Sequence, residues 1–313
     1  MAIIGIKSYG DKRFLTQNIY LRSKFGKKTI KLSLNTGCSC PNRDGSKGFG
    51  GCTYCSSSLS GDFSAPSKYS ITDQLKQQTE LLSSKWKDCL YIAYFQAGSN
   101  TYGSFEKLKA GFEEALRYKD VVGIAIATRA DCISPQMLDY LGELSHRTYL
   151  TVELGLQTVH DKTADRINRC HSYDDFLREF ELLTSRNINV CVHIINGLPY
   201  ETHDMMMRTA TEVSRLHPHS VKIHMLHILR NTVLETQYNC ERFHILSLDE
   251  YIDITADQIE LMPPDTVIAR ITGDPDRNSL TAPAWTANKK AVLNGIDKEL
   301  TRRQSWQGKY FNK

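Results

Sequence analysis

The sequence lacks the features that mark several classes of protein. No window comes near the roughly 18 uninterrupted apolar residues of a membrane-spanning helix, so no membrane protein is expected. Residues 1–14 lack a charged start followed by a long apolar run and a small-residue cleavage site, and no signal peptide is predicted. The chain has no internal repeat. Its 41% apolar and 24% charged residues are typical of a globular chain, which excludes a disordered or fibrous protein.

The sequence also lacks the cysteine pattern of a small secreted protein held by disulfides. Its nine cysteines are an odd number in 313 residues, and five of them are scattered singly. This usage indicates a reducing, cytoplasmic compartment, in which clustered cysteines are more often metal ligands than disulfides. The single cysteines are expected to be small packed residues: Cys89, Cys132, Cys170, Cys191 and Cys240.

A strong overall charge is missing as well, but the charge that is present is unevenly spread. The net charge is +4, yet residues 1–31 hold eight Lys or Arg and one acid, and residues 289–313 hold seven Lys or Arg and two acids. The body between them is therefore acidic. Two basic ends suit a polyanion such as RNA, and the alternative is that they are solvated tails.

What the sequence does contain is a regular alternation of strand-like and helix-like segments. Near-continuous apolar runs predict strands at 29–36, 90–96, 121–128, 149–157, 188–196 and 221–229. Helical spacing follows at 71–87, 105–118, 135–144, 173–186, 202–216 and 248–261. Four of the helices follow a candidate N-cap serine: Ser104, Ser134, Ser172 and Ser247.

Six strand–helix pairs with strands this apolar indicate a parallel sheet covered on both faces. Right-handed crossovers curl such a sheet, so the predicted fold is α/β, a partial (β/α)6 TIM-like barrel. Residues 266–272 are a candidate for one more strand, and 287–303 for a last helix. We expect a basic N-terminal extension at 1–28, a core at 29–262 and a basic C-terminal extension at 263–313.

Polar residues recur at the carboxyl end of every predicted strand, which is the edge where barrels of this kind hold their chemistry. A purely structural barrel does not need this pattern, and it therefore indicates an enzyme. In chain order the main residues are Cys38, Cys40, Cys52, Cys55, Gln96, Ala97, Gly98, Ser99, Asn100, Thr101, Thr128, Arg129, Asp131, Glu153, Gln157, His193, Asn196, Gly197, His224 and His227. We expect His224 and His227, three apart on one strand, to face opposite sides.

The strongest of these signals is the cysteine cluster CSCPNRDGSKGFGGCTYC, at residues 38–55. A C-x-x-C pair brings two thiolates onto one metal through a tight turn, and a glycine-rich loop supplies more. Structural zinc prefers four ligands, and iron–sulfur clusters are also held by thiolates. Four cysteines are present, so the spacing alone leaves zinc and an iron–sulfur cluster both open.

These residues resemble a radical S-adenosylmethionine (SAM) enzyme. The superfamily's common motif is C-x-x-x-C-x-x-C, whereas here eleven residues separate Cys40 from Cys52. The chain is similar instead to the branch of YtqA- and YhcC-type proteins, which is related to the Elongator catalytic subunit. The matching motifs, in chain order, are LNTGCSCPNRDG, GGCTYC, QAGSNTYG, ATRADCIS, ELGLQT, NRCHS, NGLPYET, KIHMLHILRNT, LTAPAWTANK and WQGK.

The resemblance implies a [4Fe–4S] cluster held by three cysteines, with SAM bound to the free iron and cleaved to methionine and a 5′-deoxyadenosyl radical. By position the ligands are Cys40, Cys52 and Cys55, since the first ligand precedes a proline in related proteins. Cys38 is the alternative to Cys40.

The resemblance also assigns residues to SAM. Gln157 and Arg169 match a Gln and an Arg that contact SAM in the coproporphyrinogen-oxidase-like branch. The expected SAM contacts are Gln96, Ala97, Gly98, Asn100, Thr101, Thr128, Glu153, Gln157, Arg169, His193 and Gly197. Glu153 and His193 are in addition the candidates for a catalytic role.

The same resemblance implies a substrate. The Elongator subunit acts on the wobble uridine of tRNA, and YtqA-type proteins are associated with converting carboxymethylaminomethyluridine to aminomethyluridine. The implied partners are tRNA, gripped at the anticodon arm by the basic ends, and a one-electron donor such as a flavodoxin or ferredoxin. Two alternatives stay open: a radical SAM enzyme acting on a small molecule, and a non-catalytic, zinc-stabilised RNA-binding protein.

Overall fold

The computed structural model describes residues 9–56, 59 and 64–311 and divides the chain into two compact units. The first unit is Leu21–Gly155 with Cys170–Val190, and the second is Met1–Tyr20, Leu156–Arg169 and Cys191–Lys313. Of the predicted features, Lys7, Lys313 and part of the loop after the first strand lie outside the described residues.

The strands form a seven-stranded sheet of order β1-β2-β3-β4-β5-β6-β8. Each pair within a unit is parallel. The predicted α/β partial barrel is therefore confirmed, with one strand more than the six expected. That strand, β8, is Val267–Arg270, inside the segment that the sequence marked as a candidate.

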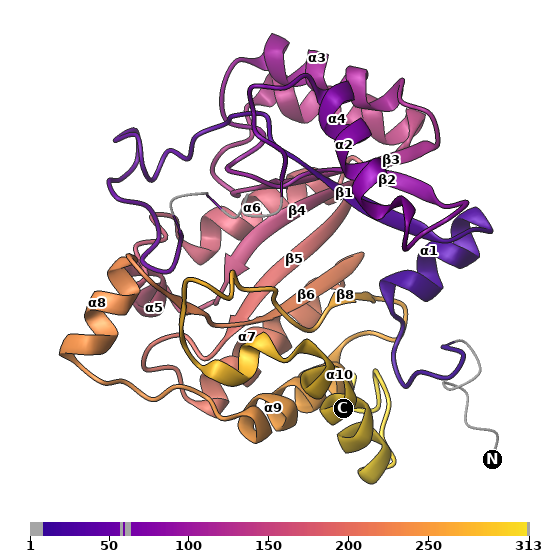
Figure 1. Ribbon diagram of the computed structural model, residues 1–313. Helices are drawn as coiled ribbons and strands as arrows, with labels where there is room; N and C mark the ends of the chain where they lie inside the picture. The colour runs from indigo at the N-terminus through magenta and orange to yellow at the C-terminus, as the bar shows by residue number, and fades with distance from the viewer. Residues whose placement is uncertain (1–8, 57–58, 60–63, 312–313) are drawn as a thin grey trace. The chain divides into compact units, whose positions relative to one another are not determined.

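The first unit holds the strands β1 Thr29–Leu34, β2 Leu90–Phe95, β3 Val121–Thr128 and most of β4 Tyr149–Gln157. Its helices are α2 Ile71–Ser83, α3 Phe105–Leu116, α4 Pro135–Arg147 and α6 Tyr173–Thr184. In Figure 1, α2, α3 and α4 lie on one side of β1–β3. The fully buried strand residues, such as Leu32 and Ile126, reflect this cover and explain the unbroken apolar runs.

The second unit holds most of β5 Asn189–Asn196, with β6 Ser220–Met225 and β8. The helices α7 His203–Leu216 and α9 Leu248–Leu261 lie on one side of these strands (Figure 1), followed by α10 Lys289–Arg302. A small antiparallel pair adds β7 Ile228–Leu229 and β9 Leu280–Ala282. The remaining elements are α1 Gln17–Phe25, α5 Asp161–Arg166, α8 Val233–Cys240 and the 3-10 turn Ala284–Ala287.

The predicted helix starts are confirmed in detail. The side chains of Ser104, Ser134, Ser172 and Ser247 each accept a hydrogen bond from the backbone N–H three residues on. The predicted strand 221–229 is wrong in its second half. The chain leaves the sheet after Met225, and Ile228 and Leu229 pair with β9 instead. His227 therefore does not lie on β6, and the expectation that it faces away from His224 loses its basis.

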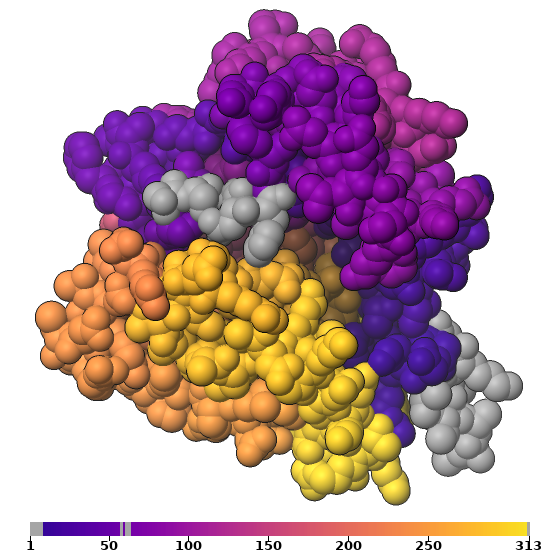
Figure 2. All heavy atoms as spheres, in the orientation of Figure 1, coloured from indigo at the N-terminus to yellow at the C-terminus, as the bar shows by residue number. Residues whose placement is uncertain are grey.

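The basic C-terminal helix is bound to its own unit by ion pairs. The Arg303 guanidinium contacts Glu299, Asp257 and Glu260, and Arg302 pairs with Glu299. Figure 2 shows this C-terminal segment, in yellow, lying against the orange segment that contains α8 and α9. Part of the positive charge counted in the sequence is thus neutralised by neighbouring acids. Within the described ranges, no helix is long and apolar enough to cross a membrane.

Glu179 on α6 makes the stability of the protein depend on pH. Its side chain is 8% exposed, and its Oε1 has no hydrogen-bond partner in the described part of the chain. Burial raises its pKa to about 7, against the attraction of Arg186 and Arg178. The unfolded carboxyl titrates near about 4.3, so the unfolded chain loses this proton first as the pH rises. The free energy of unfolding therefore decreases as the pH rises from the pKa of the unfolded carboxyl to that of the folded one.

We predict that Glu179→Gln is more stable than the wild type by on the order of 2 kcal/mol at pH 8, and that the gain shrinks towards pH 5. Urea denaturation of the full chain at a series of pH values measures this difference. Glu181→Gln, an exposed position on the same helix, is the matched control and should be neutral. A gain that is equal at both pH values would contradict the assignment.

Candidate functional site

The cysteine loop follows β1 in the first unit, and its described residues 35–56 contain several hydrogen bonds between their own backbone groups. Arg43 N–H donates to Cys40 O at 2.8 Å, and Cys55 N–H donates to Cys52 O at 3.0 Å, so both cysteine segments are tight turns. Asn42 is fully buried between them. Its side-chain Nδ2 lies 3.7 Å from Cys52 Sγ, and its backbone carbonyl accepts a hydrogen bond from Gly51 N–H at 2.8 Å. One asparagine thereby joins the two ends of the loop.

Three of the four loop cysteines influence one another electrostatically. A hydrogen bond from the Cys55 thiol, opposed by burial, brings the pKa of Cys52 down to about 6. The pKa of Cys55 is raised by the same hydrogen bond, by burial and by the neighbouring Cys52 and Cys40. Burial raises the pKa of Cys38, whose neighbours are Thr36 and Lys107. The structure thus joins Cys52 and Cys55 by a hydrogen bond between their thiols, with Cys40 within electrostatic reach of Cys55, and this soft sulfur donor set fits an iron–sulfur cluster.

An ion-pair bridge ties the cysteine loop to the end of β3. Lys47 Nζ lies 3.1 Å from Asp131 Oδ2, and Arg129 grips the same carboxylate with Nε and Nη2 at 2.8 and 2.9 Å. Burial opposes ionisation of Asp131, but the Arg129 guanidinium outweighs it and holds the pKa at about 2. Arg129 is 9% exposed and lies within electrostatic reach of Cys40 and Cys52, although Asp131 balances part of its charge.

The loop after β2 approaches the cysteine loop by backbone contact. Gly98 has φ +75°, and a Cβ on it would lie 2.3 Å from Cys38 O, so only glycine fits. Ser99 N–H donates to Ser39 O at 3.1 Å. Gln96 accepts from Ser33 Oγ at 3.1 Å, and Ala97 is 3% exposed.

Buried polar side chains fix the shape of that loop. Asn100 donates to Phe95 O and Ala127 O at 3.1 Å and accepts from Thr36 Oγ1 at 2.9 Å. The hydroxyls of Thr101 and Thr128 lie 2.6 Å apart, and Thr101 also donates to Cys132 O. These contacts make Asn100, Thr101 and Thr128 supports of the loop backbone. Their direct contact with SAM stays a prediction.

Glu153 on β4 is paired within the first unit. It is 1% exposed, and Lys31 Nζ on β1 lies 2.5 Å from its Oε1. Lys31 also lies over the ring of Tyr94, 4.8 Å from its centroid. A buried carboxylate with one strong cationic partner is neutralised in place, which keeps the charge at this site small.

Arg169 organises the predicted SAM residues of the second unit. It is 1% exposed, and its Nη1 donates to Leu156 O at 2.5 Å and to Thr158 O at 2.6 Å, on either side of Gln157. Gln157 itself takes a left-handed backbone with φ +62°. Arg169 therefore fixes the bend that presents Gln157, and a contact of its own with SAM stays a prediction.

His193 and Gly197 complete the predicted set in this unit. The His193 and His224 rings lie 5.5 Å apart between centroids. Gly197 has φ +86° and packs against Leu246, where a Cβ would be 3.2 Å from Leu246 Cδ1. The turn after β5 therefore favours glycine at this position, and a contact of Gly197 with SAM stays a prediction.

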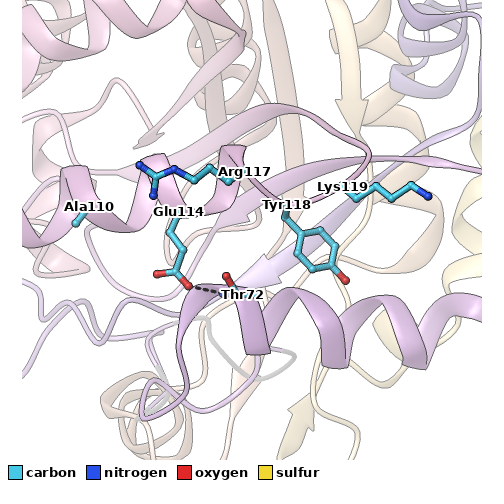
Figure 3. A pocket seen from close by; sticks show the side chains of 6 residues that line it. All are labelled: Thr72, Ala110, Glu114, Arg117, Tyr118 and Lys119. Atoms are coloured by element: carbon cyan, nitrogen blue, oxygen red, sulfur yellow. Dashed lines mark hydrogen bonds between the residues drawn. The ribbon is translucent and has the colours of Figure 1, made fainter.

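A hollow on the first unit is lined by none of the site residues described above. Figure 3 shows its lining, Thr72, Ala110, Glu114, Arg117, Tyr118 and Lys119, which comes from α2, α3 and the residues that follow α3. Thr72 N–H donates to Glu114 Oε1 at 2.7 Å across it. It contains no cysteine and no predicted SAM residue, so it is not the candidate site.

Comparison with known proteins identifies the family. Residues 35–213 match the model of the Radical SAM superfamily, and residues 218–302 match the Radical_SAM C-terminal domain. The chain belongs to the radical SAM superfamily. It is therefore an enzyme of the class that binds a [4Fe–4S] cluster and SAM, and the cysteine loop with its three grouped thiols is the part that fits the cluster. The zinc-stabilised, non-catalytic alternative is thereby set aside.

Three known proteins are similar to this chain in sequence or in structure. It is 46% identical over 303 residues to the uncharacterized protein YtqA of Bacillus subtilis, covering 97% of this chain and 94% of that one. It is 27% identical over 170 residues to Elongator complex protein 3 of Danio rerio, covering 51% and 30%. The Methanocaldococcus infernus Elp3 structure superimposes with a TM-score of 0.67 at 16% identity, over 89% and 64%, and shows a shared fold.

Sequence reasoning missed several supporting residues. Lys31, Asn42 and Lys47 were not singled out, although each holds a predicted site residue or its loop in place. Lys47 lies between the cysteines in sequence, but nothing in the local pattern indicates that its partner is Asp131. Lys31 sits in a strand otherwise rich in apolar residues, and a charge in such a run was the available signal.

The grouping of the thiols predicts different outcomes for two similar substitutions. Cys38→Ser is expected to retain about four irons and four sulfides per chain after anaerobic reconstitution, because the contacts that shift the pKa of Cys38 come from Thr36 and Lys107, whereas Cys55 is coupled to Cys52 and Cys40. Cys40→Ser is expected to lose most of this iron. Colorimetric iron and sulfide counts on the two variants measure it. The reverse pattern would assign the ligand role to Cys38.

The buried charge of Arg129 predicts an effect on the redox potential of the bound cluster. A positive charge near the cluster favours its reduced, more negative state. Arg129→Gln is expected to lower the midpoint potential by on the order of tens of millivolts. Arg129→Lys, which keeps the charge, should stay closer to the wild type. Redox titration followed by electron paramagnetic resonance measures both, and equal potentials in all three proteins would refute the effect.

Proposed function

We propose that this radical SAM enzyme modifies the wobble uridine of tRNA, converting its carboxymethylaminomethyl group at C5 to aminomethyl. The observation that carries the proposal is the similarity of half the chain to Elongator complex protein 3. The chain is also similar to YtqA over nearly its whole length, and the motif resemblance described above associates proteins of that type with this base.

The chemistry of the reaction suits the family. Removing a carboxymethyl group from nitrogen has no easy acid–base route, and abstraction of a hydrogen from the adjacent carbon is a first step that this family is equipped to perform. The bound cluster and SAM supply the radical that abstracts this hydrogen. For the chain itself we propose that Cys40, Cys52 and Cys55 hold the cluster and that the loop after β2 positions SAM.

For the remaining site residues we propose contacts that follow the assignments from the resemblance. The SAM contacts are completed by Gln157 and Arg169, and Glu153 and His193 lie near the reacting groups. The electron comes from a donor such as a flavodoxin or ferredoxin. The cysteine usage and this redox chemistry fit the cytoplasm.

An exposed aromatic on the cysteine loop favours a nucleic-acid substrate. Phe49 is 79% exposed, while its ring covers Gly45 so closely that a Cβ there would lie 2.8 Å from Phe49 Cε1. Asp44 and Phe49 form a β-bridge, which fixes the backbone at Phe49. An exposed ring close in sequence to the cluster ligands is suited to stacking on a base. Among the C-terminal cations, Lys290 and Lys298 are exposed and suited to phosphate contacts.

The test is made with the anaerobically reconstituted enzyme, SAM, dithionite and tRNA that carries carboxymethylaminomethyluridine. We expect tRNA to accelerate formation of 5′-deoxyadenosine, and mass spectrometry of the digested tRNA to show aminomethyluridine. Phe49→Ala is expected to raise the KM for tRNA about tenfold, because base stacking contributes about 1–3 kcal/mol. The rate of SAM cleavage without tRNA should not change.

Leu81→Ala is the matched control, since Leu81 is 75% exposed on α2 of the same unit. It should leave the KM for tRNA unchanged. If tRNA neither accelerates SAM cleavage nor changes in composition, the tRNA proposal is wrong. The alternative, a small-molecule substrate, then becomes the one to pursue.

A further inference from the structure

The second unit contains a group of buried nitrogen atoms that the assignments above leave without a role. His224 Nε2, His227 Nε2 and Arg270 Nε are all buried and have no hydrogen-bond partner among the residues that the structure describes. Buried polar atoms are almost always paired in folded proteins, because an unpaired one has lost its water without replacement. Three in one neighbourhood indicate a group that binds there.

Strand register brings these residues to one face of the sheet. His193 on β5 is opposite Lys222 on β6, and Lys222 is opposite Arg270 on β8. His224 is two residues beyond Lys222 and therefore shares its face. Val221 and Ile223, which alternate with them, are fully buried on the other face. In Figure 1, α7 and α9 lie on one side of these three strands.

A bulge in β8 determines the face of the sheet to which Arg270 points. Val221 pairs with Ile268, but the next residue, Lys222, pairs with Arg270, so Ala269 is the extra residue. Such an extra residue reverses the side to which the following side chains point. Without it Ala269 would face His193 and Lys222, and Arg270 would face the other side.

His227 is placed by a glycine. It follows the end of β6, and its ring packs on Gly273, where a Cβ would lie 2.3 Å from His227 Cε1 and 2.9 Å from Nε2. Gly273 lies three residues after Arg270, so the segment that follows β8 carries the ring towards the same region. The two histidines therefore do not diverge as they would on one continuous strand.

The charges around these three residues indicate what charge a bound ligand would carry. Burial, reinforced by Arg270, lowers the pKa of His224, and burial lowers that of His227 to about 4, so both imidazoles are neutral near pH 7. The positive charge is that of Arg270 and Lys222. Arg270 shares its charge with Asp274, which also lies 3.1 Å from Lys289. A neighbourhood with this limited positive charge suits a monoanion better than a dianionic phosphate.

We propose that His224, His227 and Arg270 form a subsite for a carboxylate, and that the carboxylate is that of the substrate. The guanidinium Nε–H and the two imidazole rings offer hydrogen bonds to the two oxygens of one carboxylate group. The identity of the ligand rests on the proposed function, because the carboxymethylaminomethyl side chain ends in a carboxylate and the aminomethyl product does not. The subsite thus distinguishes substrate from product.

The first experiment uses acetate as the probe. The full chain, reconstituted and labelled with ¹³C at histidine Cε1, is titrated with acetate, and chloride at equal ionic strength is the control. We expect saturable shifts of two of the ten histidine signals, which disappear in His224→Gln and His227→Gln respectively. His203→Gln, at an exposed histidine of the same unit, should leave both shifts intact. Acetate that shifts neither signal overturns the subsite.

The second experiment tests whether the bound carboxylate is that of the substrate or that of SAM. Equilibrium dialysis compares the nucleosides 5-carboxymethylaminomethyluridine and 5-aminomethyluridine. The wild type is expected to prefer the first by about tenfold or more, and Arg270→Gln to remove this preference while the Kd for SAM stays unchanged. Arg270→Lys should restore part of it. A parallel loss of SAM affinity would assign the site to the SAM carboxylate and overturn the substrate assignment.

The two experiments separate failure of the subsite from failure of the proposed function. Acetate binding with no binding of either nucleoside leaves the carboxylate subsite standing and counts against the uridine substrate. Binding of both nucleosides with equal affinity supports the uridine substrate and overturns the subsite.

Discussion

The buried carboxylate of Asp131 is the contact on which the arrangement of the first unit depends. It joins Lys47, which lies between the cysteines, to Arg129 at the end of β3. The loop that carries the thiols is long and rich in glycine, and a loop of that kind would be costly to hold in one shape by its backbone alone. The ion pair of Lys47 with Asp131, whose side chain is 5% exposed, supplies this constraint. It also places a permanent positive charge close to the thiols, so the same contact that fixes the loop adjusts its chemistry.

The two units differ in the hydrogen-bond partners of their buried polar groups. In the first unit Asn100, Thr101 and Thr128 bond to one another and to backbone carbonyls, and Glu153 pairs with Lys31. Such a network resists rearrangement, which suits a platform for a cofactor. In the second unit the nitrogen atoms of His224, His227 and Arg270 face a basic neighbourhood without such partners in the described ranges. An enzyme that must hold one cofactor and exchange one substrate needs both kinds of surface.

Much of the fold could be predicted from the sequence, for a physical reason. The strands β3 and β4 and the helix α9 have the predicted bounds, because local periodicity and serine caps determine them. The strand 221–229 was extended too far, because its apolar pattern continues while its partner changes to β9, more than fifty residues later. The short helices α5 and α8 carry too little pattern to be recognised. For the site, the cysteine cluster and the polar strand ends were visible, but pairings such as Lys31 with Glu153, 122 residues apart, are created only by folding.

The extra residue in β8 means that strand register, and not only residue identity, determines which side chains meet a ligand. If the same sequence paired with β6 without the bulge, every chemical group of the strand would be present, but Ala269 would lie opposite Lys222 and Arg270 would turn away from His193 and Lys222. Two relatives that differ only in this bulge can keep all their cofactor residues and still accept different substrates. A change in the register of β8 is thus a route by which this scaffold can change specificity without altering the cysteine loop.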